Sequence, residues 1–271
     1  MRRRTALGVL AGLVATAGVP AMAASGASAA GASAVAAEEV RDHLKVSIAN
    51  VGNVAQPQVG SILDAREPHI LVVSEARSAR AHLGDVAERK GYVLRQYGTE
   101  EGEEGPNIAL LVRKDVEILD RMPMKMNENW YFRPNCDVAL NTRKPRVYPA
   151  IVLKVDGKRW NVVGVHFPPG GPDGGSCATG QRNGPAWKES KERIQAYAAN
   201  HPEARVVAAG DFNAFDVEMV NHFPGFDVKD GGNVDHAISK KDRSVRFDWK
   251  DRHEALQGHG WFTFGLSTPA G

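Results

Sequence analysis

Apolar and polar residues follow a pattern that changes period from segment to segment near the start of the chain. Residues 44–49 alternate as a half-buried strand does, Val59, Ile62 and Leu63 recur at helical spacing, and residues 69–74 form a short apolar run. The pattern therefore predicts a β-α-β opening.

The same criteria predict elements over the rest of the chain. One helix is expected over residues 79–90, and a second helix, with an apolar face at Trp187, Ile194 and Tyr197, runs to about Asn200. Apolar runs bounded by turn residues predict strands over residues 92–97, 107–113, 116–120, 147–155, 160–166, 205–209, 234–239 and 261–266.

Strand clusters with helices between them favour an α/β sandwich, in which two mixed sheets lie face to face with helices outside. Asp156-Gly157, between two of the strands, is a strong hairpin signal. The chain has 271 residues without internal repeats or heptads. A single domain over residues 40–268 is therefore expected, long enough to bury a sizeable core.

The first residues have the layout of a secretory signal. Three arginines, at positions 2–4, precede an apolar stretch over residues 6–19, and small residues follow. A membrane-spanning helix needs roughly 20 apolar residues, and residues 25–36 are too small and polar to extend the stretch. We therefore expect a signal peptide and leader over residues 1–29, cleaved after Ala23 or Ala29, and a secreted, extracellular protein without a transmembrane anchor after signal removal.

Net charge and cysteine content indicate how the protein could bind a polyanion and whether it contains a disulfide. The formal net charge is +2, and loss of the three N-terminal arginines would leave a nearly neutral chain, so a broad electrostatic grip on nucleic acid is not expected. Cys136 and Cys177 would meet an oxidising compartment, where they are expected to form a disulfide; free buried thiols are the alternative. This disulfide would be structural, not catalytic.

Two acidic residues come directly after apolar strands. Glu75 follows the predicted strand at 69–74, where a carboxylate can project into a cleft and bind a hard cation such as Mg²⁺; a helix-initiating Glu is the alternative. Gly210-Asp211-Phe212-Asn213 follows the strand at 205–209 and is expected to present a carboxylate and an amide on one side, because residues two apart share a strand face; an ordinary turn is the alternative.

Histidines accompany these acids. His166 ends the predicted strand at 160–166, and Asp235 lies inside an apolar run, where an unpaired charge is costly. Asp235 therefore needs a partner. His253 is the candidate, because a carboxylate that holds one ring nitrogen leaves the other nitrogen for the substrate.

The order of these motifs resembles that of the endonuclease/exonuclease/phosphatase superfamily, which includes pancreatic-type deoxyribonucleases, abasic-site endonucleases, bacterial sphingomyelinases and inositol polyphosphate phosphatases. The resemblance extends over residues 44–266 and is carried by Asn50, Glu75, His166, Gly210-Asp211-Phe212-Asn213, Asp235 and His253. It implies a four-layer α/β/β/α sandwich of two mixed sheets, with the active site at one edge of the sheets.

The resemblance also implies roles for these residues. Asn50 and Glu75 would hold a divalent metal, Mg²⁺ first, with Mn²⁺ or Ca²⁺ as alternatives. His166 would contact the phosphate or protonate the leaving oxygen. Asp211 and Asn213 would orient or deprotonate the attacking water.

The same family pattern implies that Asp235 braces His253, which would act on the scissile phosphate. Asp211 and His253 both remain candidates for the general base. One residue departs from the pattern: the last family motif is Ser-Asp-His, and Arg252 takes the place of its metal-binding Asp. Asp251 could reach the site through a bulge, Arg252 could bind the phosphate, or catalysis could be impaired.

Arg146 matches a frequent family arginine, and its planar guanidinium could grip a non-scissile phosphate; a solvated surface arginine is the alternative. Trp130 and its aromatic neighbours could face a membrane or belong to the core.

We therefore expect a monomeric, metal-dependent phosphoester hydrolase, above all a nuclease or phosphodiesterase, with nucleic acid favoured over lipid as substrate. A sphingomyelinase or inositol phosphatase is one alternative. A catalytically impaired secreted binding protein is the other.

Overall fold

The computed structural model describes residues 44–52, 58–76, 80–96, 108–131, 142–143, 145–173, 183–242, 245–256 and 259–268. These ranges belong to one compact unit, Val40–Gly271. The predicted signal peptide and leader over residues 1–29 lie outside the described residues, as do Cys136 and Cys177. Across the described ranges, no helix combines the length and apolar character needed to cross a membrane.

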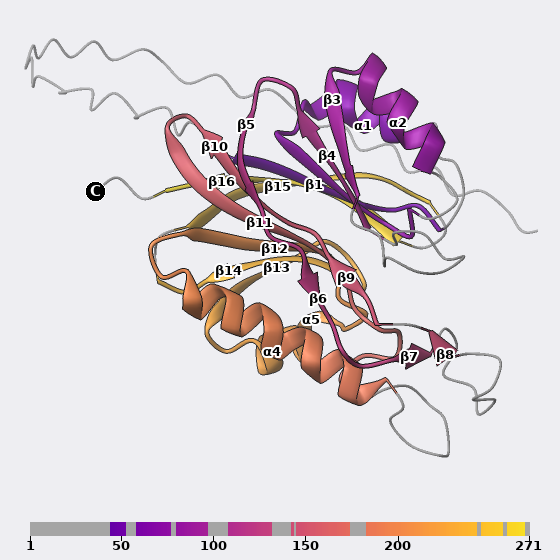
Figure 1. Cartoon of the computed structure of the whole chain (residues 1–271), viewed down its shortest axis with the longest axis vertical. Coiled ribbons are helices and arrows are strands. Elements are labelled where there is room, and N and C mark those ends of the chain that lie inside the picture. Colours follow the sequence, from indigo (N-terminus) through magenta and orange to yellow (C-terminus); the bar gives the residue numbers. More distant parts are fainter. Residues whose placement is uncertain are drawn as a thin grey trace, which may run out of the picture. The chain divides into compact units, whose positions relative to one another are not determined.

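Two six-stranded sheets form the centre of this unit (Figure 1). The first sheet has the strand order β15-β16-β1-β2-β4-β3. Its β1 and β2 pair in parallel, and its other neighbours are antiparallel. The strands are β1 (Leu44–Asn50), β2 (Ile70–Ser74), β3 (Tyr92–Gln96), β4 (Ile108–Arg113), β15 (Arg246–Leu256) and β16 (His259–Ser267).

The second sheet has the order β13-β14-β12-β11-β10-β5, in which β11 and β12 pair in parallel. Its strands are β5 (Glu117–Arg121), β10 (Ala150–Val155), β11 (Lys158–His166), β12 (Arg205–Asp211), β13 (Phe226–Asp230) and β14 (Asp235–Lys240). Two short ribbons pair β6 (Met124–Lys125) with β9 (Val147–Tyr148) and β7 (Trp130–Tyr131) with β8 (Thr142–Arg143).

Helices cover the outer face of each sheet, which makes four layers (Figure 1). Helices α1 (Gln58–Arg66) and α2 (Arg80–Arg89) pack on the first sheet, and α4 (Gly184–Asn200) and α5 (Asp216–His222) lie along the second. The α/β/β/α sandwich of two mixed sheets is therefore confirmed.

Strand β2 shows why both faces of the sheets are apolar. Ile70 and Val72 belong to the cluster between the sheets, whereas Leu71 and Val73 belong to the cluster under α1 and α2. Successive side chains of a strand point to opposite faces, so a strand covered on both sides needs a continuous apolar run.

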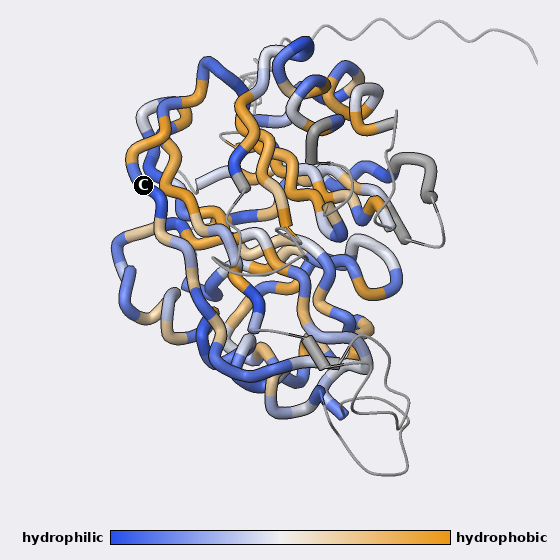
Figure 2. The backbone as a smooth tube through the Cα atoms, turned by 45° about the vertical axis from the view of Figure 1, so that its right-hand side comes forward, coloured by the Kyte–Doolittle hydropathy of each residue, from blue (hydrophilic) through white to orange (hydrophobic). Residues whose placement is uncertain are grey.

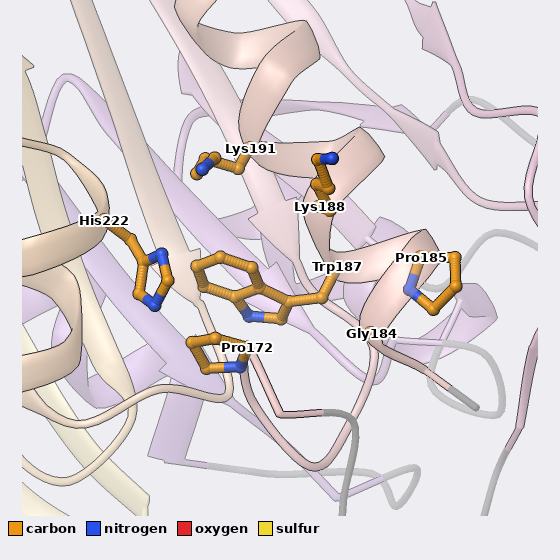
Figure 3. Close-up of a pocket in the computed structure, with 7 residues that line it drawn as sticks. All are labelled: Pro172, Gly184, Pro185, Trp187, Lys188, Lys191 and His222. Atoms are coloured by element: carbon orange, nitrogen blue, oxygen red, sulfur yellow. The ribbon is translucent and has the colours of Figure 1, made fainter. Parts of the chain in front are cut away.

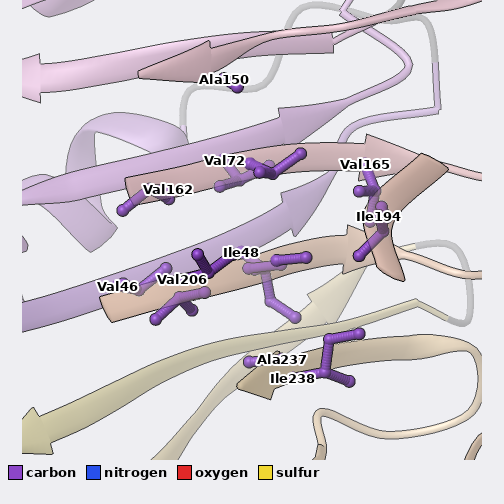
Figure 4. Close-up of a cluster of buried hydrophobic side chains, with 14 of the residues drawn as sticks. Val46, Ile48, Val72, Ala150, Val162, Val165, Ile194, Val206, Ala237 and Ile238 are labelled. Atoms are coloured by element: carbon purple, nitrogen blue, oxygen red, sulfur yellow. The ribbon is translucent and has the colours of Figure 1, made fainter. Parts of the chain in front are cut away.

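The cluster between the sheets joins residues from distant parts of the chain. Val46, Ile48 and Val72 of the first sheet share it with Val162 of the second (Figure 4). Burying each such side chain stabilises the fold by roughly 1.5–3 kcal/mol. Hydropathy follows the same layers, since apolar stretches run along the paired strands and hydrophilic stretches along the loops (Figure 2).

Most predicted elements are confirmed, within a few residues at their ends. The Asp156-Gly157 hairpin is confirmed as a two-residue loop with φ values of 47° and 73°, as a type I′ turn requires. The strand predicted over residues 147–155 is divided at Pro149 into β9 and β10, because proline has no N–H to donate to a ladder.

Six of the described elements were not predicted: the two-residue strands β6, β7 and β8, and the longer elements α5, β13 and β15. Helix α5 exposes Val217 to 73% and Val220 to 57% and buries only Met219 among its apolar residues, so its sequence has no continuous apolar face. Strand β15 is at the edge of the first sheet and is rich in charged residues, as edge strands often are.

Candidate active site

Four strands end close together at one edge of the sandwich. Asn50 and Ser74 are paired at the ends of β1 and β2, and Glu75 follows directly. His166 and Asp211 are paired at the ends of β11 and β12. Since each pair is parallel, its carboxyl ends lie at the same edge of its sheet, and the polar residues of both sheets meet there.

Unusual backbone conformations set the direction of the chain where it leaves these strands. Glu75 has a φ of 57° and Asn213 a φ of 49°, which is the left-handed region. Gly210, before Asp211, has a φ of 137°, and a Cβ at this position would lie 2.1 Å from the carbonyl oxygen of Val165. Position 210 therefore requires glycine, and the close approach of β11 and β12 depends on it.

Asn50 connects the two sheets through its side-chain amide. Its Nδ2 donates to Glu75 Oε1 at 3.2 Å and to Asp211 Oδ2 at 3.1 Å. Its Oδ1 accepts the backbone N–H of Gly52 at 2.9 Å, which fixes the orientation of the amide. In this arrangement Asn50 holds the two carboxylates through its Nδ2. Its Oδ1 would face a metal between them only if the side-chain amide rotated by about half a turn.

Glu75, His166 and Asp211 form a compact set of possible metal ligands. One ligand atom of each lies within 4.8 Å of the other two. His166 Nε2 is 3.6 Å from Asp211 Oδ2. His166 and Asp211 are buried, whereas Glu75 is partly exposed, so the set opens toward solvent on the Glu75 side.

Asn213 is arranged differently from the sequence-based expectation. It lies beyond the end of β12, so the argument that it shares a strand face with Asp211 does not hold. Its backbone N–H donates to Asp211 Oδ1 at 2.7 Å, and its Nδ2 donates to the carbonyl of Phe167 at 2.8 Å. Asn213 thus holds Asp211 and ties the two strand ends together.

Asp235 begins β14 and is buried opposite Asp211. His253 lies on β15 opposite Trp261, and its side chain lies outside the described residues. The pairing of Asp235 with His253 therefore stays a prediction.

Arg252, which stands where the family motif has an Asp, lies on β15 as well, next to Asp251. Asp251 forms an ion pair with Arg66 of α1, on the outer side of the first sheet. It does not reach the site through a bulge, so that explanation is wrong. Arg252, one residue on, has its guanidinium carbon 5.9 Å from the ring centre of Phe262 and is exposed.

Arg146 is buried, at 6% exposure, which excludes the solvated-surface interpretation. Its Nη1 donates to the carbonyl of His166, and its guanidinium carbon lies 3.8 Å from the ring centre of Trp130. Trp130 is itself buried and so is a core residue. Arg146 fixes the end of β11 in this arrangement.

Sequence reasoning missed two residues that support the site. Tyr148 donates its hydroxyl to the carbonyl of His166 at 3.3 Å, and burial raises the pKa of Tyr148 to about 12, which keeps it a donor. Trp261 Nε1 donates to the carbonyl of Asn50 at 3.0 Å. Both lie inside apolar strands, where the pattern shows only core positions.

A separate pocket of about 430 Å³ lies beside α4 (Figure 3). Trp187 and His222 form its floor, with Lys188 and Lys191 above them on α4. Among the described residues that line it there is no carboxylate.

No protein-family model matches the sequence, and no curated protein matches it. Solved structures do match its fold over more than four fifths of the chain. An endonuclease/exonuclease/phosphatase family protein from Bacteroides thetaiotaomicron has 13% identity and a TM-score of 0.62, and the match covers 84% of this chain and 98% of that one. This chain has the endonuclease/exonuclease/phosphatase fold.

Two further structures with the endonuclease/exonuclease/phosphatase fold differ in what they act on or bind. TDP2 from D. rerio, solved with a single-strand DNA product, has 15% identity and a TM-score of 0.55, with 83% of this chain and 99% of that chain covered. Mannosyl-6-phosphatase from Bacteroides thetaiotaomicron has 12% identity and a TM-score of 0.60, with 83% and 99% covered.

Proposed function

We propose that this protein is a secreted, metal-dependent phosphoester hydrolase that cleaves phosphodiesters, with nucleic acid as the first substrate class. The observation that carries the proposal is the convergence of Glu75, His166 and Asp211 within 4.8 Å at the meeting strand ends. The fold supports it, because solved structures with this fold include proteins named as nuclease-family members and as a phosphatase.

The residues at the strand ends fit a divalent cation. Glu75 and Asp211 offer carboxylate oxygens, the ligands that Mg²⁺ prefers, and Mg²⁺ uses only one or two protein carboxylates beside water and substrate oxygens. Asn50 holds these two carboxylates 3.2 and 3.1 Å from its Nδ2, so they are drawn to one point. A bound cation would polarise a phosphoryl oxygen and offset the negative charge that develops on it.

The protein side chains have separate tasks in this proposal. His166 would contact the phosphate or protonate the leaving oxygen, and Arg146 and Tyr148 hold its carbonyl. Asp211 or His253 takes the proton of the attacking water. Asn213 keeps the Asp211 carboxylate in place through its N–H.

The position of Arg252 supports a role in binding the substrate phosphate, in preference to impaired catalysis. Its exposed guanidinium extends from β15, the strand that also carries His253. A guanidinium there would bind a phosphate oxygen through charge-assisted hydrogen bonds. Arg252→Asp should therefore lower kcat/KM; a rise in activity or in metal affinity would show that Arg252 only replaces a lost ligand.

The decisive experiment tests substrate class and metal need together. Purified protein is incubated with Mg²⁺, Mn²⁺ or Ca²⁺ and with plasmid DNA, RNA, sphingomyelin, bis-p-nitrophenyl phosphate or p-nitrophenyl phosphate, each beside an EDTA control. Hydrolysis of DNA, RNA or the diester that stops in EDTA is expected. Turnover that persists in excess chelator would refute the metal-dependent mechanism, and hydrolysis of the monoester alone would replace the diesterase with a phosphatase.

Two variants assign the activity to the site. Glu75→Gln should reduce kcat/KM by about 100-fold or more. Losses of up to this order follow even when a residue that only hydrogen-bonds to a metal ligand is replaced. Glu88→Gln, on the exposed face of α2, is the matched control and should behave as wild type. Equal activity of both variants would place the chemistry elsewhere.

The Asp235–His253 pair is tested by a double-mutant comparison. If the acid only orients and stabilises the imidazole, Asp235→Ala, His253→Ala and the double variant should lose similar activity, roughly 10²- to 10⁴-fold. Independent, multiplicative losses would show that His253 does not depend on Asp235.

A further inference from the structure

A second group of possible metal ligands lies on the outer face of the second sheet. It consists of Asp216, the first residue of α5, Asp230, the last residue of β13, and His236 of β14. One ligand atom of each lies within 4.8 Å of the other two, and Asp230 is paired with His236 across the two strands. None of these residues belongs to the candidate active site.

His236 is the residue that needs an explanation. It is fully buried, at 0% exposure. Its Nε2 lies 2.7 Å from the carbonyl oxygen of Ala214, and since a carbonyl only accepts, Nε2 carries the hydrogen. The other nitrogen, Nδ1, is buried and makes no hydrogen bond to any described residue.

Nδ1 faces a carboxylate instead of a donor. It lies 3.3 Å from Asp216 Oδ1. In a neutral imidazole with its hydrogen on Nε2, Nδ1 has a lone pair, so two acceptors would face each other inside the protein. A cation shared between them removes this conflict, either a proton on Nδ1 or a metal ion.

The distance between Nδ1 and Asp216 Oδ1 fits a shared metal ion. In a tetrahedral zinc site with bonds of about 2.0–2.2 Å, neighbouring ligand atoms are about 3.3–3.5 Å apart, which is the observed separation of Nδ1 and Asp216 Oδ1. The hydrogen bond from Nε2 to the Ala214 carbonyl is the contact that a metal-ligating histidine makes with its second nitrogen.

The carboxylates are placed to complete such a site. The side chain of Asp216 is 54% exposed, so the ion has access from solvent and a water molecule can take the remaining position. Asp230 accepts the N–H of Gly232 and lies 3.7 Å from Lys250 Nζ, which leaves acceptor capacity on its carboxylate. Burial and the nearby charge of Asp230 raise the pKa of Asp216, and a bound cation would relieve both effects.

We propose that Asp216, Asp230 and His236 form a second divalent-cation site, of the Zn²⁺ class, separate from the candidate active site. Imidazole nitrogen and carboxylate oxygen are both ligand types that zinc accepts. The site would join the start of α5 to the β13–β14 hairpin. Because His236 and Asp216 hold the chain on both sides of Phe215, bound zinc would fasten the segment that follows Asp211 and Asn213.

The test is zinc binding without substrate, so its result is independent of hydrolysis. Equilibrium dialysis of the full chain against micromolar Zn²⁺ gives the number of bound ions and their affinity for wild type, Asp216→Asn, Asp227→Asn and Asp211→Asn. Asp216 is exposed, so its change to Asn should not unfold the protein. Asp227, on β13 but outside the group, is the matched control for loss of one acid.

Wild type is expected to bind a zinc ion that Asp216→Asn binds about 100-fold more weakly or loses, while Asp227→Asn and Asp211→Asn keep it. Cobalt substitution should give the visible absorption of a low-symmetry site in the same three proteins and not in Asp216→Asn. Three outcomes would overturn the proposal: no zinc bound by wild type, equal binding by Asp216→Asn, or loss of this ion in Asp211→Asn. The first would leave a protonated His236 as the shared cation.

Discussion

At the scale of single residues, the side-chain amide of Asn50 decides how the candidate site is held together. Its two N–H groups point to Glu75 and Asp211, and its oxygen is satisfied by Gly52. Two carboxylates this close repel each other unless donors or a cation lie between them. Asn50 therefore provides part of the stabilisation that a metal ion would provide fully.

Asn50→Asp should make stability depend on metal. The change removes both N–H donors and adds a buried acid beside Glu75 and Asp211, so in EDTA the free energy of unfolding should fall by about 2–4 kcal/mol. A divalent cation should restore most of it. Urea denaturation of both proteins, with EDTA and with Mg²⁺ or Mn²⁺, measures this; equal stability in EDTA would contradict the bracing role of Asn50.

His69 gives the fold a dependence on pH. Its Nδ1 accepts the backbone N–H of Lys45 at 2.9 Å, and burial, with the nearby charge of Arg113, lowers the pKa of His69 to about 4. The unfolded chain binds a proton near pH 6.5, whereas the folded chain does not. Stability from this group is therefore present above pH 6.5 and is lost as pH falls toward 4.

The free energy of unfolding should fall by about 3 kcal/mol between pH 7 and pH 4 because of His69, as the difference between its unfolded and folded pKa values requires. Urea denaturation of wild type and His69→Gln between pH 7 and 4 measures it, and the variant should show a smaller change with pH. The same pH dependence in both proteins would assign the effect to other groups.

At the scale of elements, the parallel pair β11–β12 is held closer than a side chain at position 210 would allow. Gly210 lies against the carbonyl of Val165, and Asp211 is the next residue. The conformation of one glycine thus connects strand pairing to the position of a candidate catalytic carboxylate.

Gly210→Ala should be severely destabilising. The new Cβ would lie 2.1 Å from the Val165 oxygen, and a backbone φ of 137° is unfavourable for alanine. A loss of about 3 kcal/mol or more in unfolding free energy is expected. Gly225→Ala, where a Cβ meets nothing within 4 Å, is the control. Similar denaturation midpoints for both variants would contradict the close approach.

Sequence patterning predicts the strands that are buried on both faces, because their apolar runs end where the polar site residues begin. Glu75, His166 and Asp211 could therefore be placed at strand ends before their proximity was known. Patterning cannot give the direction of a side chain after a strand ends. The role of Asn213 and the ligand group around His236 depend on turn geometry and on pairing between distant strands.

At the scale of the whole molecule, the two sheets approach each other closely at Gly164 of β11. A Cβ there would lie 2.8 Å from Leu110 Cδ2, 3.1 Å from Ile108 Cγ2 and 3.3 Å from Val72 Cγ1. The first sheet therefore packs directly on the backbone of the second. Interiors are close-packed, so an added methyl group at this point must displace its neighbours.

Gly164→Ala should destabilise by about 1–3 kcal/mol through overpacking, and Leu110→Ala by about 2–5 kcal/mol through a cavity. In the double variant the new methyl group occupies part of the space that Leu110 leaves. The combined loss should therefore be at least about 1 kcal/mol smaller than the sum. Additive losses in chemical denaturation would show that the two positions do not touch.

The pairing of β1 with β16 also governs when the molecule can become complete during its synthesis. Ser47 and Thr263 bond through their hydroxyls at 2.6 Å although they are 216 residues apart in sequence. While a nascent chain is still on the ribosome, β1 can pair with β2 but lacks its other neighbour. Contacts of such sequence separation form slowly, and an unpaired strand edge invites mispairing in the meantime. Strand β1, which is synthesised first, therefore lacks its second neighbour until β16 has left the ribosome.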